Sequence, residues 1–357
     1  MKKLLVAVSA LILTANTAFA QSTIDINTLQ LNTITTAVPF LIINPESRGG
    51  GMGDVGVATS ADAASVHWNA AKVAFAQDKG ALNLSYTPWL RKLVPDISLM
   101  YLSGYYKIDD MSAVTGSLRY FSLGSIQFTD QNGQDLIQFS PNEFAIDAAY
   151  ARKLSDRFSA GIAARYINSN LTGGQVVGGA NSKPGRTAAI DMSVYYENTD
   201  MVLADKDFEL AWGLNVSNLG AKIQYTDATN RDFLPTNLRF GPRATLHIDD
   251  YNKITLGLDI NKYLVPTPPE YSTDTNGAII TDANGDPVVF SGLNPDRPVV
   301  TAAISSFYDA PGTVAYDENG DPYIVSGSKF GEEMREFNIG VGAEYWYDNQ
   351  FAARVGY

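Results

Sequence analysis

The chain contains no cysteine, and this absence excludes several kinds of site at once. Without a thiol there is no disulfide framework, no lipoprotein acylation site, no thiol nucleophile and no cysteine-based metal centre. Only two histidines are present, His67 and His247, and they cannot form a zinc site without carboxylates. The sequence has no G-x-S-x-G elbow and no other convincing catalytic set. We therefore expect no enzymatic activity, no cofactor and no metal centre.

Positive charge is also scarce. The 26 lysines and arginines are outnumbered by 38 aspartates and glutamates, which gives a net charge of -12 and an isoelectric point near 4.6. This balance argues against nucleic acids and anionic membrane surfaces as electrostatic partners.

Long apolar runs are missing after the first twenty residues. Lys2 and Lys3, the apolar run that follows them, and Ala18-Phe19-Ala20 before Gln21 predict a cleavable secretory signal over residues 1–20. No later stretch has 18 consecutive apolar residues, so we expect no transmembrane helix. An exported chain can still cross a membrane as a closed barrel of strands.

The chain is instead rich in apolar residues that alternate with small or charged ones. Phe144, Ile146, Ala148 and Tyr150 share one face of an extended chain, while Asp147 falls on the other face. The same period of two predicts eleven strands, at 81–89, 96–107, 111–122, 142–152, 157–168, 187–197, 207–218, 236–248, 253–262, 335–347 and 350–357.

The connections between these strands favour a membrane barrel over a soluble β-sandwich, which would show the same alternation. Short turns alternate with long polar loops at 123–142, 168–187, 218–236 and 262–335. This asymmetry is typical of outer-membrane barrels, which have short periplasmic turns and long extracellular loops. Bacterial barrels have an even number of strands. We therefore expect an all-β barrel over residues 81–357 that is incomplete at its C-terminal end.

Several charged residues fall on the face that would line the interior of such a barrel. Their simplest interpretation is a lumenal charge network, and a transport or latching role is the alternative. These residues are Asp147, Arg165, Asp191, Glu209, Arg239 and Arg243.

A glycine-rich stretch precedes the strands, within an N-terminal extension at residues 21–80. Gly51, Gly53 and Gly56 match the spacing G-x-G-x-x-G of dinucleotide-binding turns, but no strand leads directly into them and no crossover helices follow. We favour a small plug inside the barrel, whose glycines allow turns and close packing. Ser60 and Asn69 are candidate N-caps of two short helices in it.

Four segments carry a resemblance to a known family. They are "SRGGGMGDVGVATSADAASVHWNAAKVAF", "YTPWLRKLVPDI", "SLRYFSLGSIQFTD" and "EFAIDAAYARKLSDRF". Together they resemble the PorV family of the type IX secretion system, which is related to the FadL hydrocarbon transporters. One departure is Asn69-Ala70-Ala71, where these families commonly have Asn-Pro-Ala.

The resemblance implies a 14-stranded, FadL-like outer-membrane barrel with an N-terminal plug, of which about eleven strands are present. It also implies a shuttle that takes cargo proteins with a C-terminal signal domain from an SprA-type translocon to a PorU-type sortase complex at the cell surface. The alternative function is a FadL-type channel for uptake of hydrophobic small molecules.

Two further features leave alternatives open. "TDANGDP" and "YDENGDP" have acidic spacing like that of a calcium loop but lack its glycine and its final glutamate, so we favour hairpin turns over a weak calcium site. In the first outer loop, large apolar groups stand beside basic ones, which fits either an anchor at the membrane interface or a protein contact. The residues of this candidate partner-binding loop are Trp89, Leu90, Arg91 and Lys92.

Overall fold

We describe the protein from a computed structural model, which covers residues 32–357 except 93, 130–131, 178–179, 227–230 and 275–276. The predicted signal peptide lies outside the described residues. Residues 34–357 form one compact unit, and the description below concerns that unit. Among the described residues, no helix is both long and apolar enough to cross a membrane.

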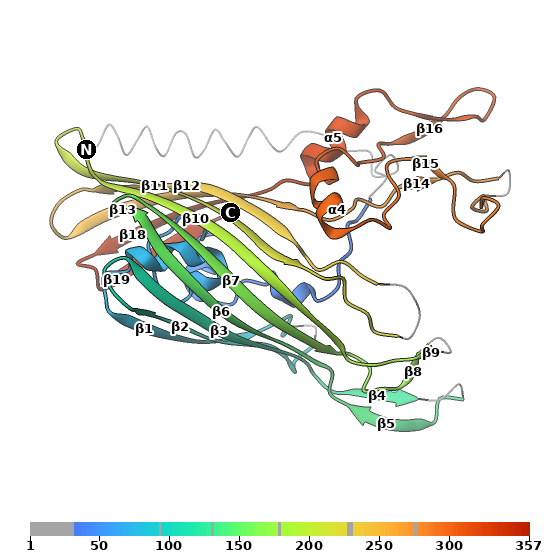
Figure 1. The fold of residues 1–357 in the computed structure, drawn as a ribbon, viewed down its shortest axis with the longest axis horizontal. Helices are drawn as coiled ribbons and strands as arrows, with labels where there is room; N and C mark the ends of the chain where they lie inside the picture. The colour runs from blue at the N-terminus through green and yellow to red at the C-terminus, as the bar shows by residue number, and fades with distance from the viewer. Residues whose placement is uncertain (1–31, 93, 130–131, 178–179, 227–230, 275–276) are drawn as a thin grey trace. The chain divides into compact units, whose positions relative to one another are not determined.

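The unit is dominated by one antiparallel sheet of eleven strands, in which each strand pairs with its neighbours along the chain (Figure 1). The eleven predicted strands are therefore confirmed. In order, they are β1 (Gly80–Pro88), β2 (Ile97–Lys107), β3 (Ser112–Leu123), β6 (Asn142–Ser155), β7 (Phe158–Asn170), β10 (Gly185–Leu203), β11 (Lys206–Gly220), β12 (Asn237–His247), β13 (Asn252–Tyr263), β18 (Asn338–Tyr347) and β19 (Phe351–Gly356).

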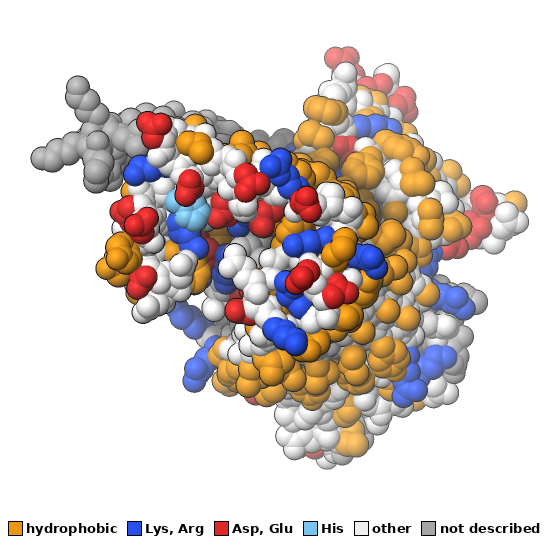
Figure 2. All heavy atoms as spheres, turned by 60° about the vertical axis from the view of Figure 1, so that its left-hand side comes forward, with side chains coloured by type: hydrophobic (Ala, Val, Ile, Leu, Met, Phe, Trp, Pro, Cys, Tyr) orange, Lys and Arg blue, Asp and Glu red, His pale blue; other side chains and the backbone are white. Residues whose placement is uncertain are grey.

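The sheet exposes its large apolar side chains and buries its charged ones. In β6 and β7, Ile146 and Ile162 are 49% and 54% exposed, whereas Asp147 and Arg165 are each 4% exposed. Figure 2 shows the outer surface covered with hydrophobic side chains, and charged side chains gathered at the end with the short turns. A soluble sandwich would bury its apolar face, so that alternative is wrong. The observed arrangement is the one found in outer-membrane barrels.

The two ends of the sheet differ in their connections. At one end the strands are joined by tight turns, such as Ala204-Asp205 between β10 and β11, where both residues have positive φ of 52° and 59°. Such values fit a two-residue hairpin turn whose twist matches the strands. The pairing continues to Leu203 and Lys206, so β10 extends six residues beyond its predicted end.

The opposite end carries the long loops, which are more structured than the sequence predicted. Two of them contain the hairpins β4 (Ile126–Thr129) with β5 (Asp135–Phe139) and β8 (Val176–Val177) with β9 (Ala180–Asn181). Residues 264–336, here called the loop module, contain the elements β14 (Glu270–Tyr271), β15 (Val289–Ser291), α4 (Val299–Ser305), β16 (Val314–Tyr316), β17 (Pro322–Ile324) and α5 (Ser328–Arg335).

The sheet is strongly curved but open. β1 pairs with β2, β19 pairs with β18, and no pairing joins β1 to β19 within the described part of the chain. The described strands thus form the wall expected of a barrel without its closure.

Residues 34–76, here called the inner segment, lie inside the curve of this wall (Figure 1). The segment contains η2 (Pro39–Leu41), α2 (Ser47–Gly51), α3 (Ser65–Trp68) and η3 (Ala70–Phe75). Asn69 is confirmed as an N-cap, since its side chain accepts a hydrogen bond from the backbone N–H of Ala71 at the start of η3. The prediction for Ser60 is wrong, because α3 begins five residues later and the side chain of Ser60 instead accepts from Arg48.

Candidate functional site

The candidate site is the buried face on which the inner segment packs against the wall. Glycines stand at close contacts both within the inner segment and between it and the wall. A Cβ added to Gly56 would lie 2.1 Å from Cδ2 of Trp68, and one added to Gly51 would lie 3.2 Å from Cβ of Arg354. Gly53 has a φ of +68°, which strains any other residue, and it lies against the backbone of Tyr357. These three glycines thus lie at contacts and a turn of the inner segment.

Asn69 connects the inner segment to the wall as well as capping η3. Its Nδ2 donates to the backbone carbonyls of Val57, at 3.1 Å, and of Val194 in β10, at 2.9 Å. The wall makes room for this amide at Gly213, where an added Cβ would lie 2.8 Å from Nδ2 of Asn69. Asn69 therefore acts as a capping residue with alanine at position 70.

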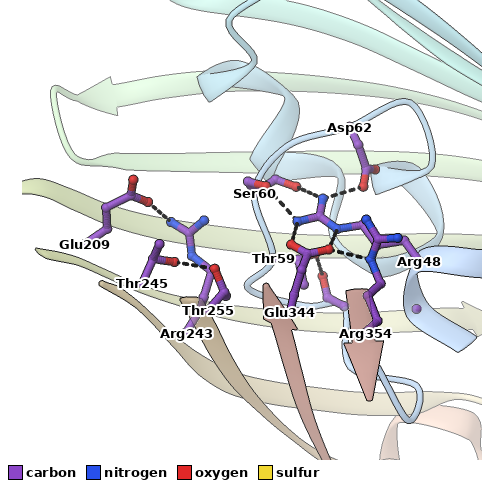
Figure 3. A network of polar contacts seen from close by, with 12 residues as sticks. Arg48, Thr59, Ser60, Asp62, Glu209, Arg243, Thr245, Thr255, Glu344 and Arg354 are labelled. Carbon is purple, nitrogen blue, oxygen red and sulfur yellow. Dashed lines mark hydrogen bonds and ion pairs between the residues drawn. The ribbon is translucent and has the colours of Figure 1, made fainter. Parts of the chain in front are cut away.

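Arg48, in α2, connects the inner segment to the wall (Figure 3). Its Nη2 lies 2.9 Å from Oε1 of Glu344 in β18, and its Nε lies 3.0 Å from Oε2 of the same carboxylate. Nη1 of Arg48 lies 2.9 Å from Asp62, and Arg354 in β19 shares Glu344 at 2.6 Å. One carboxylate of the wall thus holds two guanidinium groups, one from each side of the contact.

Arg165, in β7, lies between two carboxylates of neighbouring strands. It forms ion pairs with Asp147 in β6 and, at 3.0 Å, with Asp191 in β10. Nη1 of Arg165 also donates to Oδ1 of Asn218. All of these groups are buried, so the ion pairs and the amide together compensate for the loss of water.

Arg119, in β3, holds the first part of the inner segment. It donates to the backbone carbonyls of Phe40, at 3.2 Å, and Leu41. Its Nη2 also lies 2.7 Å from Nδ1 of His67. Because Arg119 is a donor only, Nδ1 must accept and the proton of the neutral ring lies on Nε2. Burial, together with the charge of Arg119, holds the pKa of His67 well below its ordinary value.

Asp259 and Arg239 complete the contact on β13 and β12. Oδ2 of Asp259 accepts hydrogen bonds from the backbone N–H groups of Gly56, at 2.9 Å, and Val57, at 3.0 Å. The guanidinium of Arg239 lies 4.4 Å from the ring centre of Trp68, and its Nη1 is 3.8 Å from Asp259. A positive group over an indole face is attracted to the ring as well as to the carboxylate.

The remaining predicted interior charges lie towards the short-turn end (Figure 3). Arg243 in β12 pairs with Glu209 in β11 and with Glu197 in β10, at 3.1 Å each. His247 lies 2.7 Å from the other oxygen of Glu209. The structure thus places the six predicted charged residues in three separate clusters, around Arg165, Arg239 and Arg243.

The sequence did not single out several charged residues of the site. Three of them occupy inward positions of predicted strands, so the alternation itself could have identified Arg119, Asp259 and Glu344. Arg48 and Lys72 carry no such signal, because the inner segment has no regular period. Nζ of Lys72 donates to the carbonyl of Gly56, at 2.7 Å, and to Oγ1 of Thr59.

The charged groups of this site make contacts among themselves, with the inner segment and with the wall. Its carboxylates and guanidinium groups neutralise one another or hold backbone groups. No group of three or more histidine, cysteine, aspartate or glutamate residues suited to a metal ion occurs among the residues that the structure describes. A cavity lined by His67, Arg165 and Arg239 has a volume of about 10 Å³, which is room for about one water molecule.

The two acidic motifs of the loop module form turns. Asp282 accepts hydrogen bonds from the backbone N–H groups of Asn284 and Asp286, at 2.8 and 3.0 Å. Asp317 caps the β16–β17 hairpin in the same way. The predicted turns are confirmed.

The first outer loop divides into a buried and an exposed part. Trp89 is half-buried and packs against the apolar cluster that contains Phe40, Leu41 and Phe121. Its backbone N–H donates to the carbonyl of Ile97 at 3.0 Å. Leu90 has a φ of +50° and is exposed, as are Arg91 and Lys92. Of the four candidate partner-binding residues, three are thus accessible to a partner.

Comparisons with known proteins give one family. The family profile described as Type IX secretion system protein PorV matches residues 26–270, more than half of the chain. Among solved structures, the chain is similar to the toluene transporter TodX of Pseudomonas putida, with a TM-score of 0.38 and 10% sequence identity, over 86% of this chain and 81% of that one. No curated protein matches the chain.

Proposed function

Because the chain belongs to the PorV family of type IX secretion system proteins, we propose that it acts as the shuttle of that system in the outer membrane. In this function it binds cargo proteins by their C-terminal signal domain. It carries them from an SprA-type translocon to a PorU-type sortase complex at the cell surface. No chemical step is required of the protein itself, and we assign it no enzymatic activity.

The outward apolar surface of the eleven strands supports the location in the outer membrane. Lipid would cover the large side chains of this surface, such as Ile146 and Ile162, while the charged residues stay inside. The short turns would then lie in the periplasm and the long loops outside the cell. Partners at the cell surface would meet the loop end.

The inner segment is proposed to act as a plug. The contacts between this segment and the wall support that role. Arg119, Asp259 and Glu344 each bind the segment from a different strand. An uptake channel would need a path past this segment, and these buried contacts with several strands hold the segment in place against the wall. We therefore prefer the shuttle to the FadL-type channel.

The first outer loop is proposed to contribute to partner binding. Leu90, Arg91 and Lys92 present an apolar group beside two cations at the loop end. Trp89 holds this loop in place through its contact with the apolar cluster beneath it. An interfacial anchor in the outer leaflet is the competing role for the same residues.

The family match over residues 26–270 is the observation that carries this proposal. Its test is affinity purification of the full-length protein from its native membrane, followed by identification of the proteins that accompany it. We expect secreted proteins that share a C-terminal signal domain, together with the translocon. Recovery of the protein without any such cargo would contradict the shuttle.

A further inference from the structure

The loop module carries large apolar side chains that stay exposed in the part of the chain that the structure describes. Val300 and Ile304 lie one turn apart on α4, while Ala302 and Ser305 on the opposite side are buried. On α5, Phe330 is 70% exposed. We call this surface the α4–α5 face, and it consists of Val300, Ile304, Phe307, Tyr308, Phe330 and Met334.

The segment that follows α4 is fixed to α5 and to the wall. Nζ of Lys262, at the end of β13, lies 3.3 Å from Glu333 of α5 and 5.7 Å from the ring centre of Phe307. The backbone N–H of Ala310, just after α4, donates to Oε1 of Glu333 at 2.9 Å. The face is therefore held in one geometry by buried charged groups, as a binding surface requires.

The surroundings of the α4–α5 face are strongly acidic. Residues 264–336 contain twelve aspartates and glutamates and three lysines and arginines, so this module carries most of the chain's net negative charge. Exposed basic side chains are limited to Lys329 and Arg335 in the described part of the module. The exposed acidic residues are Asp274, Asp282, Asp286, Asp296, Asp317, Glu318 and Asp321.

This combination selects the kind of partner. An exposed group of large apolar side chains marks an interaction surface, and the acidic field around it attracts a surface rich in lysine and arginine. The same field repels anionic lipid headgroups, so a protein fits this face better than a membrane does. A small apolar centre with charge steering gives fast, reversible binding, as a carrier that must release its load requires.

We propose that the α4–α5 face is the docking surface for the folded C-terminal signal domain of cargo, which meets it with an apolar patch surrounded by basic side chains. This inference rests on the proposed shuttle function and adds the surface and the chemistry of the contact. Residues 271–336 lie beyond the part of the chain that the PorV profile matches, so the surface belongs to this chain's own loop module.

The test measures binding of the purified, detergent-solubilised full-length protein to a purified cargo signal domain. The face variant combines Val300→Ser, Ile304→Ser and Phe330→Ser. The matched control combines Ile279→Ser, Ile280→Ser and Val288→Ser, which are exposed aliphatic residues of the same module away from the two helices. We expect the face variant to bind about tenfold or more weakly and the control to bind like the wild type. Heat-modifiable migration on gels verifies that each variant keeps its folded wall.

A charge variant tests the acidic field separately. Asp317→Asn, Glu318→Gln and Asp321→Asn together should slow association and flatten its dependence on salt, because steering by exposed charges is screened. Equal binding by the wild type and the face variant would overturn the docking surface and leave the shuttle intact. Failure of the wild type to bind any signal domain would overturn the shuttle and, with it, this inference. Loss of binding to anionic vesicles in the face variant, with cargo binding unchanged, would assign the surface to lipid instead.

Discussion

Nη2 of Arg48 lies 2.9 Å from Oε1 of Glu344, although 296 positions separate the two residues in the chain. The contact joins α2 of the inner segment to β18 near the end of the sheet. It is mostly buried, with 16% of the arginine side chain and 1% of the glutamate side chain exposed. A pair of this kind stabilises the fold only while both partners are present.

Replacing Arg48 tests how much this ion pair contributes to the stability of the fold. Arg48→Met removes the partner of Glu344 and of Asp62 at once, and breaking a buried pair costs about 3–5 kcal/mol. We expect the variant to change from folded to unfolded migration on gels at a clearly lower midpoint temperature than the wild type. The control is Arg157→Met, which removes a pair with Asp200 that is 3.1 Å long but exposed and is worth about 1 kcal/mol at most. Equal midpoint temperatures for the two variants would contradict a stabilising role of the Arg48–Glu344 pair.

Substitution of Gly56 tests whether the inner segment closes the lumen. In Gly56→Ala the new Cβ would lie 2.1 Å from the buried ring of Trp68, so the segment must move while the wall remains. We expect cells with this variant to become sensitive to large antibiotics that the outer membrane normally excludes. Gly50→Ala is the matched control, because its Cβ would meet its nearest neighbour, Nδ2 of Asn44, at an ordinary 3.5 Å. Unchanged resistance with Gly56→Ala would show that the segment does not seal the wall.

The loop module should be more stable in mild acid. Burial raises the pKa of Asp309 to about 6, above that of a free aspartate, and its Oδ1 has no hydrogen-bond partner. The carboxyl of Asp309 therefore binds a proton more tightly in the folded module than in the unfolded chain. The stabilisation that this proton gives is lost as the pH rises from about 4 to about 6.

Hydrogen exchange measures this effect directly. After correction for the intrinsic rate, the amides of α4 should be better protected at pH 5 than at pH 7. Asp309→Asn should remove most of the difference, whereas Asp296→Asn, an exposed group, should preserve it. Better protection of the α4 amides at pH 7 than at pH 5 in the wild type would contradict this prediction.

Single substitutions separate the roles of Trp89 and Leu90 in the first outer loop. Trp89→Ala removes a half-buried side chain from an apolar cluster, so it should loosen the loop. Leu90→Ala changes an exposed one and should leave stability unchanged. The double variant should lose cargo co-purification while keeping its membrane assembly. Cargo binding retained in the double variant would return these residues to the role of an interfacial anchor.

Alternation along the chain was sufficient to predict the strands and the inward charges, because a strand has one strict period and the wall has two faces of opposite character. It could not predict which charges meet. Arg165 pairs with Asp147 and Asp191 because strand register brings them together, and register is a property of the whole sheet.

The inner segment and the loop module were harder to predict. Their contacts depend on residues far apart in the chain, as for Arg48 with Glu344, and no local period marks them. The sequence indicates only a long polar loop at 262–335, yet this stretch contains α4 and α5. The spacing of Val300 and Ile304, one helical turn apart, was the available signal for α4.

The most direct test of the shuttle is the fate of cargo in a strain that lacks this gene. The measurement compares the amount of a protein with a C-terminal signal domain at the cell surface, in the periplasm and in the medium. The account predicts that surface display is lost, with cargo trapped in the periplasm or released unprocessed, while uptake of fatty acids and aromatic hydrocarbons is unchanged. Normal surface display together with impaired uptake would contradict it.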